Sequence, residues 1–528
     1  MIPVSRVKTS FENAAPIVRV RNLASKRKAW RDALAHSVMV IERAMRDALL
    51  PRSEVLAGLR ILLTVLVASS CSNGAEPSPL QNAHLTFLTP PGTAEGQVPF
   101  DPPVRVALED ANGHIITVAD TEVVIALVAQ PVFPAGQPPT ALRGTIRVRT
   151  VMGIATFNDL SLPLPGDGYR LQASTGTMTP VTSEPFSVRL TFTVPSAGGD
   201  HSCGLTVAHF VYCWGLNGLG QVGDSTNVSR YIPTPARGRI AFRQVSAGGS
   251  HTCGITLDGT VQCWGGVPPG SPSAAPPPLW APALMPGLSG VDQLSAALVG
   301  QFSRSCAVTN AGVVYCWGNY DVPIQESNNP SLRYVSTVGG HTCGLTSDGT
   351  AYCWGWNNSG QLGDSTLTDR TAPVPVAGGL RFLAITAGGY HTCGIATDSI
   401  AYCWGSNAQG ALGDGTNDQR IIPTRVVGNI VFIQLSAGGL FTCGVTKNHA
   451  AYCWGYNAWG ALGDGSTTSR TVPTPVSGGH SFSAVSAGTI HSCGLASNGV
   501  YCWGLSGGGG LLGDGSSGAS LVPRRIVQ

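Results

Sequence analysis

The chain carries a repeated pair of cysteines, and this repeat constrains the fold more than any other feature. In the fullest copies His-Ser/Thr-Cys-Gly is followed by a short polar turn and then by Tyr-Cys-Trp-Gly. The pairs are Cys203 with Cys213, Cys253 with Cys263, Cys306 with Cys316, Cys343 with Cys353, Cys393 with Cys403, Cys443 with Cys453 and Cys493 with Cys502. The first Cys recurs mostly every 50 residues. A fixed period of this size indicates a repeat architecture, and one Trp and one turn per unit favour the blades of a β-propeller.

The composition agrees with an all-β protein and excludes some functions. With 68 Gly, 37 Pro and only 12% charged residues, the chain suits a turn-rich β fold better than a helical bundle or a disordered chain. Residues 71–528 hold 20 Lys/Arg against 24 Asp/Glu, so the net charge of this part is −4. It offers no basic patch for a phosphate backbone, and we expect no nucleic-acid partner.

The N-terminal region predicts export. Arg60 precedes a short apolar run, residues 61–68, that is too short to span a bilayer and is typical of a secretory signal. Met45 would give this signal an ordinary length, so we interpret residues 1–44 as a non-native extension and residues 45–70 as the signal peptide. Of the fifteen Cys only Cys71 is left without a pair. An unpaired Cys in an exported protein needs an explanation.

Ala68-Ser69-Ser70-Cys71 resembles a bacterial lipobox, in which the Cys is lipidated and becomes the new N-terminus. The resemblance implies a membrane anchor at Cys71, and Ser72 would favour the outer membrane. Ordinary cleavage after Ser70, which would leave a free thiol, is the alternative. Residues 71–81 are polar and contain Pro, as expected of a tether.

Residues 82–192 alternate short apolar strands with turns, such as the Asp-Ala-Asn-Gly turn at residues 110–113. Strands at this spacing over about 110 residues predict an immunoglobulin-like sandwich. The segments around Gly153 and Tyr169 resemble the Ig-like domains of bacterial surface proteins, which serve mostly as spacers. No Cys lies in this segment, so we expect its core alone to hold it.

The repeats begin near residue 193. The fullest unit runs from Ala387-Gly-Gly-Tyr-His-Thr-Cys-Gly through Tyr402-Cys-Trp-Gly-Ser-Asn to Gly410-Ala-Leu-Gly-Asp-Gly. These motifs resemble the repeats named for the regulator of chromosome condensation, over residues 193–528. The resemblance implies a seven-bladed β-propeller with the Trp that follows each second Cys packed between blades. We expect the last strand, near Leu521–Val527, to pair with the first blade and close the ring.

Two units depart from the repeat. After Gly265 a Pro-rich stretch, residues 267–288, replaces the usual Gly-x-Leu-Gly-Asp segment, and the third unit is 13 residues shorter between its second Cys and the next first Cys. The outer loops of both blades are therefore expected to differ from those of the other five.

The fourteen repeated Cys predict seven disulfides, since two Cys ten residues apart on a hairpin face each other and export oxidises them. Zinc ligation by His and two Cys is the alternative, but no unit supplies an obvious fourth ligand. The recurring His, as in His391, is expected to donate a structural hydrogen bond to backbone. The Asp that precedes an Arg by six residues, as Asp414 precedes Arg420, is expected to fix the outer loop, with calcium as the alternative.

The sequence contains no nucleophile–base arrangement and no phosphate loop, so we predict neither enzyme activity nor a cofactor or metal. Guanine-nucleotide exchange on a small GTPase and chromatin binding, known from the family, require an intracellular basic protein. The expected function is binding of an extracytoplasmic protein from the cell envelope. A structural envelope protein without a specific ligand is the first alternative, and a propeller-based enzyme is the second.

One face of the propeller is expected to bind the partner. In antiparallel blades the Gly-Gly-x-His loop and the Trp-Gly-x-Asn loop open on the same face, and their variable positions are apolar or aromatic in the later blades. Exposed aromatics on one side are typical anchors of an interface. The candidate partner-binding residues are Trp356, Tyr390, Leu440, Phe441, Tyr456, Trp459 and Ile490. Packing of Leu440, Phe441 and Ile490 into the central channel is the alternative.

The first prediction concerns the anchor. We expect mass spectrometry of the membrane fraction to find a mature chain that begins with an acylated Cys71. Cys71→Ala should shift the protein from the membrane to the soluble fraction, because the acyl chains are its proposed attachment. A soluble wild-type chain, or an unchanged distribution of the variant, would contradict the anchor.

Overall fold

The computed structural model describes residues 80, 82–134, 136–137, 139–176, 178–266, 279–297, 304–318, 323–326 and 330–528. Every regular element among these residues is a β-strand. No helix in this described part is long and apolar enough to cross a membrane. The predicted signal peptide and Cys71 lie outside the described residues.

Two sheets near the N-terminus pack around one core. Their strands are β1 (His84–Thr89), β2 (Ala94–Glu95), β3 (Val104–Glu109), β4 (Glu122–Ala129), β5 (Arg147–Arg149), β6 (Ile154–Phe157), β7 (Gly166–Ser174), β8 (Val181–Thr182) and β9 (Phe186–Arg189). One sheet has the order β1-β3-β6, and the other β2-β9-β7-β4-β5 with β8 beside β7. Alternate residues of facing strands, such as Val106 of β3 and Leu171 of β7, are fully buried in this core. No Cys contributes to it, so apolar burial stabilises this part.

Seven four-stranded antiparallel sheets follow, each built from four consecutive strands. Blade one has β10 (Phe192–Ala197), β11 (His201–Thr206), β12 (Val211–Gly215) and β13 (Arg230–Pro235); blade two has β14 (Phe242–Ala247), β15 (His251–Thr256), β16 (Val261–Gly265) and β17 (Leu279–Leu284). Blade three has β18 (Val291–Ser295), β19 (Ser305–Thr309), β20 (Val314–Trp317) and β21 (Ile324–Gln325); blade four has β22 (Leu332–Thr337), β23 (His341–Thr346), β24 (Ala351–Gly355) and β25 (Arg370–Pro375).

The last three blades are the most regular. Blade five has β26 (Phe382–Ala387), β27 (His391–Ala396), β28 (Ala401–Gly405) and β29 (Arg420–Arg425); blade six has β30 (Phe432–Ala437), β31 (Phe441–Thr446), β32 (Ala451–Gly455) and β33 (Arg470–Pro475); blade seven has β34 (Phe482–Ala487), β35 (His491–Ala496), β36 (Gly499–Gly504) and β37 (Ser520–Arg525). The seven sheets form the propeller that the repeats predict.

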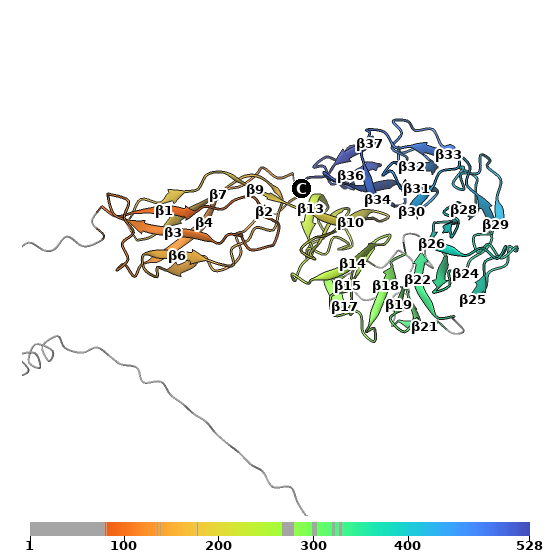
Figure 1. Ribbon diagram of the computed structural model, residues 1–528, viewed down its shortest axis with the longest axis horizontal. Coiled ribbons are helices and arrows are strands. Elements are labelled where there is room, and N and C mark those ends of the chain that lie inside the picture. Colours follow the sequence, from red (N-terminus) through yellow and green to blue (C-terminus); the bar gives the residue numbers. More distant parts are fainter. Residues whose placement is uncertain are drawn as a thin grey trace, which may run out of the picture. The chain divides into compact units, whose positions relative to one another are not determined.

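The blades stand around a common centre, with the first strand of each blade innermost and the fourth outermost (Figure 1). The prediction that the last strand pairs with the first blade is wrong. Strand β37 pairs with β36 of its own blade, and β10 pairs with β11 of blade one. Each blade is therefore one continuous segment, and the ring closes by packing and by hydrogen bonds between blades seven and one.

The structure confirms all seven predicted disulfides. The bonds join Cys203 to Cys213, Cys253 to Cys263, Cys306 to Cys316, Cys343 to Cys353, Cys393 to Cys403, Cys443 to Cys453, and Cys493 to Cys502. In every blade the two Cys are direct cross-strand partners on the second and third strands, as Cys393 is with Cys403, with Cα atoms 4.1 Å apart. Disulfides persist in oxidising compartments, so this propeller belongs outside the reducing cytosol.

The hairpin of blade seven differs from the others in its turn. Ala496 pairs with Gly499, which leaves a two-residue turn between the second and third strands. This shorter turn explains why the Cys of blade seven are nine residues apart instead of ten.

Each disulfide packs against the Trp of the next blade. Cys343 and Cys353 of blade four share a core cluster with Trp404 of blade five. Every other junction repeats this arrangement, including the one at which Cys493 and Cys502 of blade seven meet Trp214 of blade one. The Trp after each second Cys is thus core between blades, as predicted.

A closed ring of hydroxyl hydrogen bonds joins the innermost strands. In each blade the Ser or Thr next to the end of the first strand accepts a hydrogen bond from a backbone N–H of the following blade. The seven bonds, 2.9–3.1 Å long, run from Ala247 to Ser196, Ala296 to Ser246, Thr337 to Ser295, Ala387 to Ser336, Ala437 to Thr386, Ala487 to Ser436 and Ala197 to Ser486. The last bond joins blade seven to blade one, so the ring has no weaker closing link of this kind.

The disulfides give the second prediction. Under denaturing, non-reducing conditions none of the fourteen repeat Cys should react with a thiol reagent, because their sulfurs are bonded to each other. Intact mass before and after alkylation measures this. The double variant Cys443→Ser with Cys453→Ser should lower the free energy of unfolding by about 2–3 kcal/mol according to the loop-entropy model. Free thiols accompanied by stoichiometric zinc would contradict the assignment.

Candidate functional site

In six of the seven blades, all but blade three, two loops lie side by side on one face of the propeller. The first joins strands one and two and ends with the residue before the His position; the second joins strands three and four and begins with the residue after Trp-Gly. The second loop donates a backbone N–H to the carbonyl of the first loop, at 2.9–3.1 Å. The bonds run from Leu216 to Asp200, Gly266 to Ser250, Trp356 to Gly340, Ser406 to Tyr390, Tyr456 to Leu440 and Leu505 to Ile490. We call these twelve positions the paired-loop face.

Most of the predicted partner-binding residues lie on or beside this face. Trp356, Tyr390 and Leu440 are exposed, and Tyr456 and Ile490 are half-buried. Trp459 follows Tyr456 by three residues in the second loop of blade six and is 46% exposed. Tyr390 is similarly exposed, at 45%.

Phe441 was predicted to belong to this surface, and that prediction is wrong. Its side chain is only 1% exposed and packs in the core cluster that also contains Phe482 and Ala487 of the next blade. The reason is its position as the first residue of β31, where other blades place the buried His. The phenyl ring fills that space and lies against Gly438, where a Cβ atom would come within 3.0 Å of Cε1.

Among the twelve positions of the paired-loop face, the exposed apolar and aromatic side chains come from three consecutive blades. Blades four, five and six contribute Trp356, Tyr390 and Leu440. Leu216 of blade one and Ile490 of blade seven are half-buried there. Burial raises the pKa of the Asp200 carboxyl above its ordinary value. The structure therefore brings the predicted anchors together on one side of the ring.

Nε2 of the recurring His bonds to a hydroxyl, whereas the sequence predicted a bond to backbone. Its Nε2 lies 2.7–2.8 Å from a hydroxyl of the next blade, contributed by the Ser or Thr that follows the His position. The pairs are His201 with Thr252, His251 with Ser305, His341 with Thr392, His391 with Thr442 and His491 with Ser202. All seven units carry Ser or Thr at this place, a regularity in the sequence that could have identified the partner.

The hydroxyl determines which ring nitrogen of its His carries the proton. Thr442 Oγ1 donates its one proton to the carbonyl of Ala411, at 3.0 Å, so it accepts a hydrogen bond from Nε2 of His391. Nε2 of His391 therefore carries a proton, and the low pKa of the buried ring leaves Nδ1 without one near neutral pH. Burial lowers the pKa of His201 and His341 to about 3 and that of His251, His391 and His491 to about 4. These buried neutral rings therefore have a structural role, since each one joins its blade to the next by a hydrogen bond.

The Asp and Arg pairs fix the second loop as predicted. In blade five Arg420 Nε lies 2.8 Å from Asp414 Oδ2, and Asn407 and Thr416 donate hydrogen bonds to Oδ1 of the same carboxylate. Burial raises the pKa of Asp414, but the hydrogen bonds from Thr416 and Arg420 outweigh this and hold it below its ordinary value. Blades one, four and six repeat the pair. The carboxylate is saturated by protein donors, which leaves it little capacity to ligate calcium.

No group of three or more His, Cys, Asp or Glu side chains in the described residues could hold a metal ion. The Cys sulfurs are joined in disulfides and His Nε2 is bonded to a hydroxyl, so the ligands considered for zinc have other partners.

The repeats match a known family. Residues 348–395, 398–445 and 448–495 match one model of the regulator of chromosome condensation (RCC1) repeat, and residues 242–266, 333–361 and 382–411 match a second. No protein with a curated description matches the sequence.

Solved structures show the same fold. Yeast RCC1 (Prp20), solved bound to Kap60, is 22% identical with a TM-score of 0.52 over 64% of this chain and 86% of its own. Prp20p from Saccharomyces cerevisiae is 22% identical, with a TM-score of 0.53 over 64% of this chain and 88% of its own. Human WBSCR16 is 19% identical, with a TM-score of 0.51 over 61% of this chain and 92% of its own.

The buried His residues give the third prediction. Their folded pKa lies below the ordinary 6.5, so the unfolded chain binds protons first as the pH falls. Stability is fully present above pH 6.5 and declines below it, by up to about 1.4 kcal/mol per pH unit for each His. His391→Phe copies the natural Phe441. It should lower the slope of the free energy of unfolding against pH by up to the contribution of one proton. Urea midpoints between pH 5 and 7 measure it, and an unchanged slope would contradict the assignment.

Proposed function

We propose that this chain, which carries RCC1 repeats in a seven-bladed propeller, is an interaction protein of the bacterial cell envelope that binds an extracytoplasmic protein through its paired-loop face. One observation carries the proposal. The exposed aromatic and aliphatic side chains of blades four to six gather where neighbouring loops are held by backbone hydrogen bonds. A rigid surface with exposed aromatics loses little conformational entropy on binding and suits a protein partner.

The repeated polar groups support a binding role over an enzymatic one. The His rings, the Asp carboxylates and the Cys sulfurs of the regular blades are bonded within the propeller, so they join and fix the blades. The exposed side chains of the paired-loop face, in contrast, vary from blade to blade. RCC1-like propellers act mainly as binding scaffolds, which agrees with this division.

We further propose that the propeller is held at the outer membrane by lipid on Cys71, with residues 82–192 as an Ig-like spacer. The unpaired Cys after an apolar run supports the anchor. The Tyr169 hydroxyl donates a hydrogen bond to the carbonyl of Leu164, at 2.8 Å. A Tyr bonded to backbone a few residues upstream is a hallmark of immunoglobulin-like domains, and it supports the spacer assignment.

The fourth prediction tests the surface. A partner captured from envelope extract and identified by mass spectrometry should bind Tyr390→Ala or Trp459→Ala more weakly by about 1–3 kcal/mol, since truncation removes an exposed aromatic anchor. The melting temperature should stay almost unchanged. Binding is measured by calorimetry with the purified partner.

Ile422→Ala is the matched control. Ile422 is 46% exposed on the outer strand β29, away from the paired-loop face, and its truncation should leave binding intact. Equal loss of affinity in the control, or loss of stability in the two aromatic variants, would show that Tyr390 and Trp459 are not binding anchors.

A further inference from the structure

The junction between blades three and four lacks a loop that the regular junctions possess. Fourteen residues connect Gly355 to Arg370 in blade four, and the same number connects the corresponding strands of blades one, five and six. In blade three Ile324 pairs with the second Cys as Val374 does in blade four, and only five residues, 319–323, lie between Gly318 and Ile324 where eighteen lie between Gly355 and Val374. The connection of residues 319–323 in blade three does not contain the Gly-x-Leu-Gly-Asp segment.

In five blades this segment fills the space above the next blade. Its carbonyl accepts a hydrogen bond, at 2.8–3.2 Å, from the hydroxyl that follows the next blade's His position. The acceptor and donor residues are Gln221 and Thr252, Gln361 and Thr392, Ala411 and Thr442, Ala461 and Ser492, and Leu511 and Ser202. At four of these junctions the same carbonyl also accepts from Nε1 of the next blade's Trp, as Gln361 does from Trp404 at 3.0 Å.

The same segment makes two more contacts. The residue after the acceptor is a Leu or Val that is fully buried, as Leu362 is. Four residues after the acceptor, a backbone N–H donates to the outermost strand of the next blade. These bonds run from Ser225 to Trp280, Ser365 to Ile421, Gly415 to Thr471, Gly465 to Leu521 and Gly515 to Tyr231, at 2.7–3.1 Å. The filled junction thus presents one recurring set of partners for a peptide backbone.

At blade four this set of partners lines a cavity of about 380 Å³. Thr342, Trp354, Arg370 and Thr371 of the cavity wall correspond to Thr392, Trp404, Arg420 and Ile421, which the preceding loop covers at the next junction. Trp354 is 5% exposed where Trp404 is fully buried. No described residue accepts a hydrogen bond from Trp354 Nε1.

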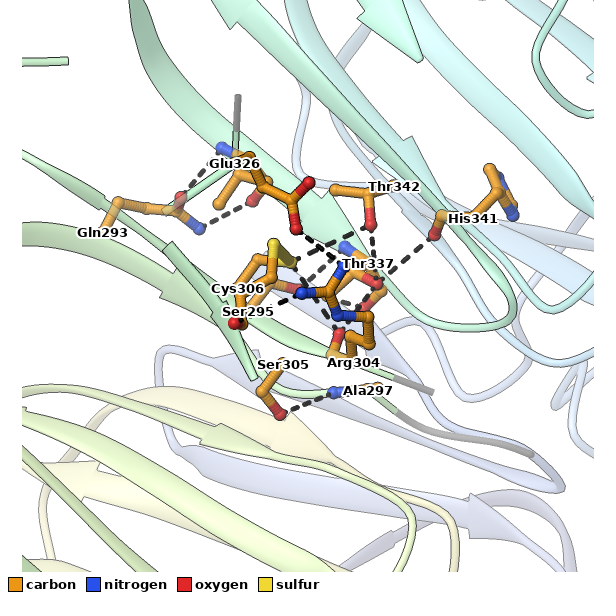
Figure 2. The surroundings of a disulfide bond; sticks show 12 residues. Gln293, Ser295, Ala297, Arg304, Ser305, Cys306, Glu326, Thr337, His341 and Thr342 are labelled. Atoms are coloured by element: carbon orange, nitrogen blue, oxygen red, sulfur yellow. Dashed lines mark hydrogen bonds and ion pairs between the residues drawn. A yellow bond between two sulfur atoms is a disulfide. The ribbon is translucent and has the colours of Figure 1, made fainter. Parts of the chain in front are cut away.

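The hydroxyl of Thr342 has been redirected at this junction. It donates to Thr337 Oγ1 at 3.2 Å instead of to a loop carbonyl. The His that would donate to it is replaced by Arg304, which forms an ion pair with Glu326 at 2.7 Å (Figure 2). Both residues line the cavity. Both regular partners of Thr342 are therefore missing from the described part of blade three.

We infer that this cavity binds an extended peptide segment of a partner protein. The segment supplies a carbonyl to Trp354 Nε1 and Thr342 Oγ1, then a Leu or Val side chain, and an N–H four residues after the carbonyl to the backbone of Thr371. A peptide fits because the chain itself fills five equivalent spaces with one. The cavity also falls within the range of about 300–1,000 Å³ typical of ligand sites.

This inference goes beyond the proposed function, because it rests on the cavity between blades three and four and not on the exposed side chains of the later blades. The two sites meet at Trp356, whose ring lies against Gly340 at the cavity rim. A partner bound on the paired-loop face could reach the cavity with one extended segment.

The fifth prediction uses a peptide of residues 406–418, Ser-Asn-Ala-Gln-Gly-Ala-Leu-Gly-Asp-Gly-Thr-Asn-Asp, as the probe. Fluorescence anisotropy should show the labelled peptide binding to the purified full-length protein. Trp354→Phe and Thr342→Val should each weaken binding by about fivefold, because each removes one donor to the peptide carbonyl. Trp404→Phe, the matched change at a filled junction, should leave it unchanged.

Further arms separate the alternatives. A peptide with Leu412→Asp should not bind, since the buried apolar position cannot take a carboxylate. Tyr390→Ala and Trp459→Ala should leave peptide binding intact, so failure of the surface and failure of the cavity are distinguishable. Absence of peptide binding, or equal weakening by Trp404→Phe, would overturn the inference. Self-association of the protein that Thr342→Val abolishes would assign the cavity to a second copy and would also overturn it.

Discussion

The contact between the disulfide of one blade and the Trp of the next is the interaction on which the propeller depends. A four-stranded blade is apolar on both faces and cannot bury itself alone, so each blade needs two neighbours. The disulfide gives one face a compact, fixed group, and the indole of the next blade covers it, as Trp404 covers Cys343 and Cys353. Because the contact is made seven times in a closed ring, no blade is terminal.

The sequence predicted this framework well because its signals are local and repeated. Cys pairs such as Cys203 with Cys213, the Trp-Gly that follows and the Asp six residues before Arg all lie within one blade, where hairpin register determines which residues meet. Partners across blades were predicted less well. The His bonds to a hydroxyl about 50 residues away, and the last strand stays in its own blade. Such contacts depend on how blades stack, which spacing along the chain does not reveal.

Phe441 illustrates the same limit. A large apolar residue beside Leu440 suggested a continuous surface patch, yet the two side chains point to different environments because residue 441 begins the strand and residue 440 ends the loop. The proposed partner-binding surface therefore consists of loop positions alone, while residues at the His position, whether His or Phe, belong to the joint between blades.

The repeated joints also explain how the ring can tolerate an irregular blade. At the junction of blades three and four the sequence lacks the Gly-x-Leu-Gly-Asp segment, but the innermost hydroxyl bond from Thr337 to Ser295 remains, and Cys306 and Cys316 still pack against Trp354. The inner part of the junction thus holds the ring, and the outer part is free to vary. A loop that only covers the next blade can be lost without opening the propeller, and its loss leaves backbone-binding groups for a segment from elsewhere.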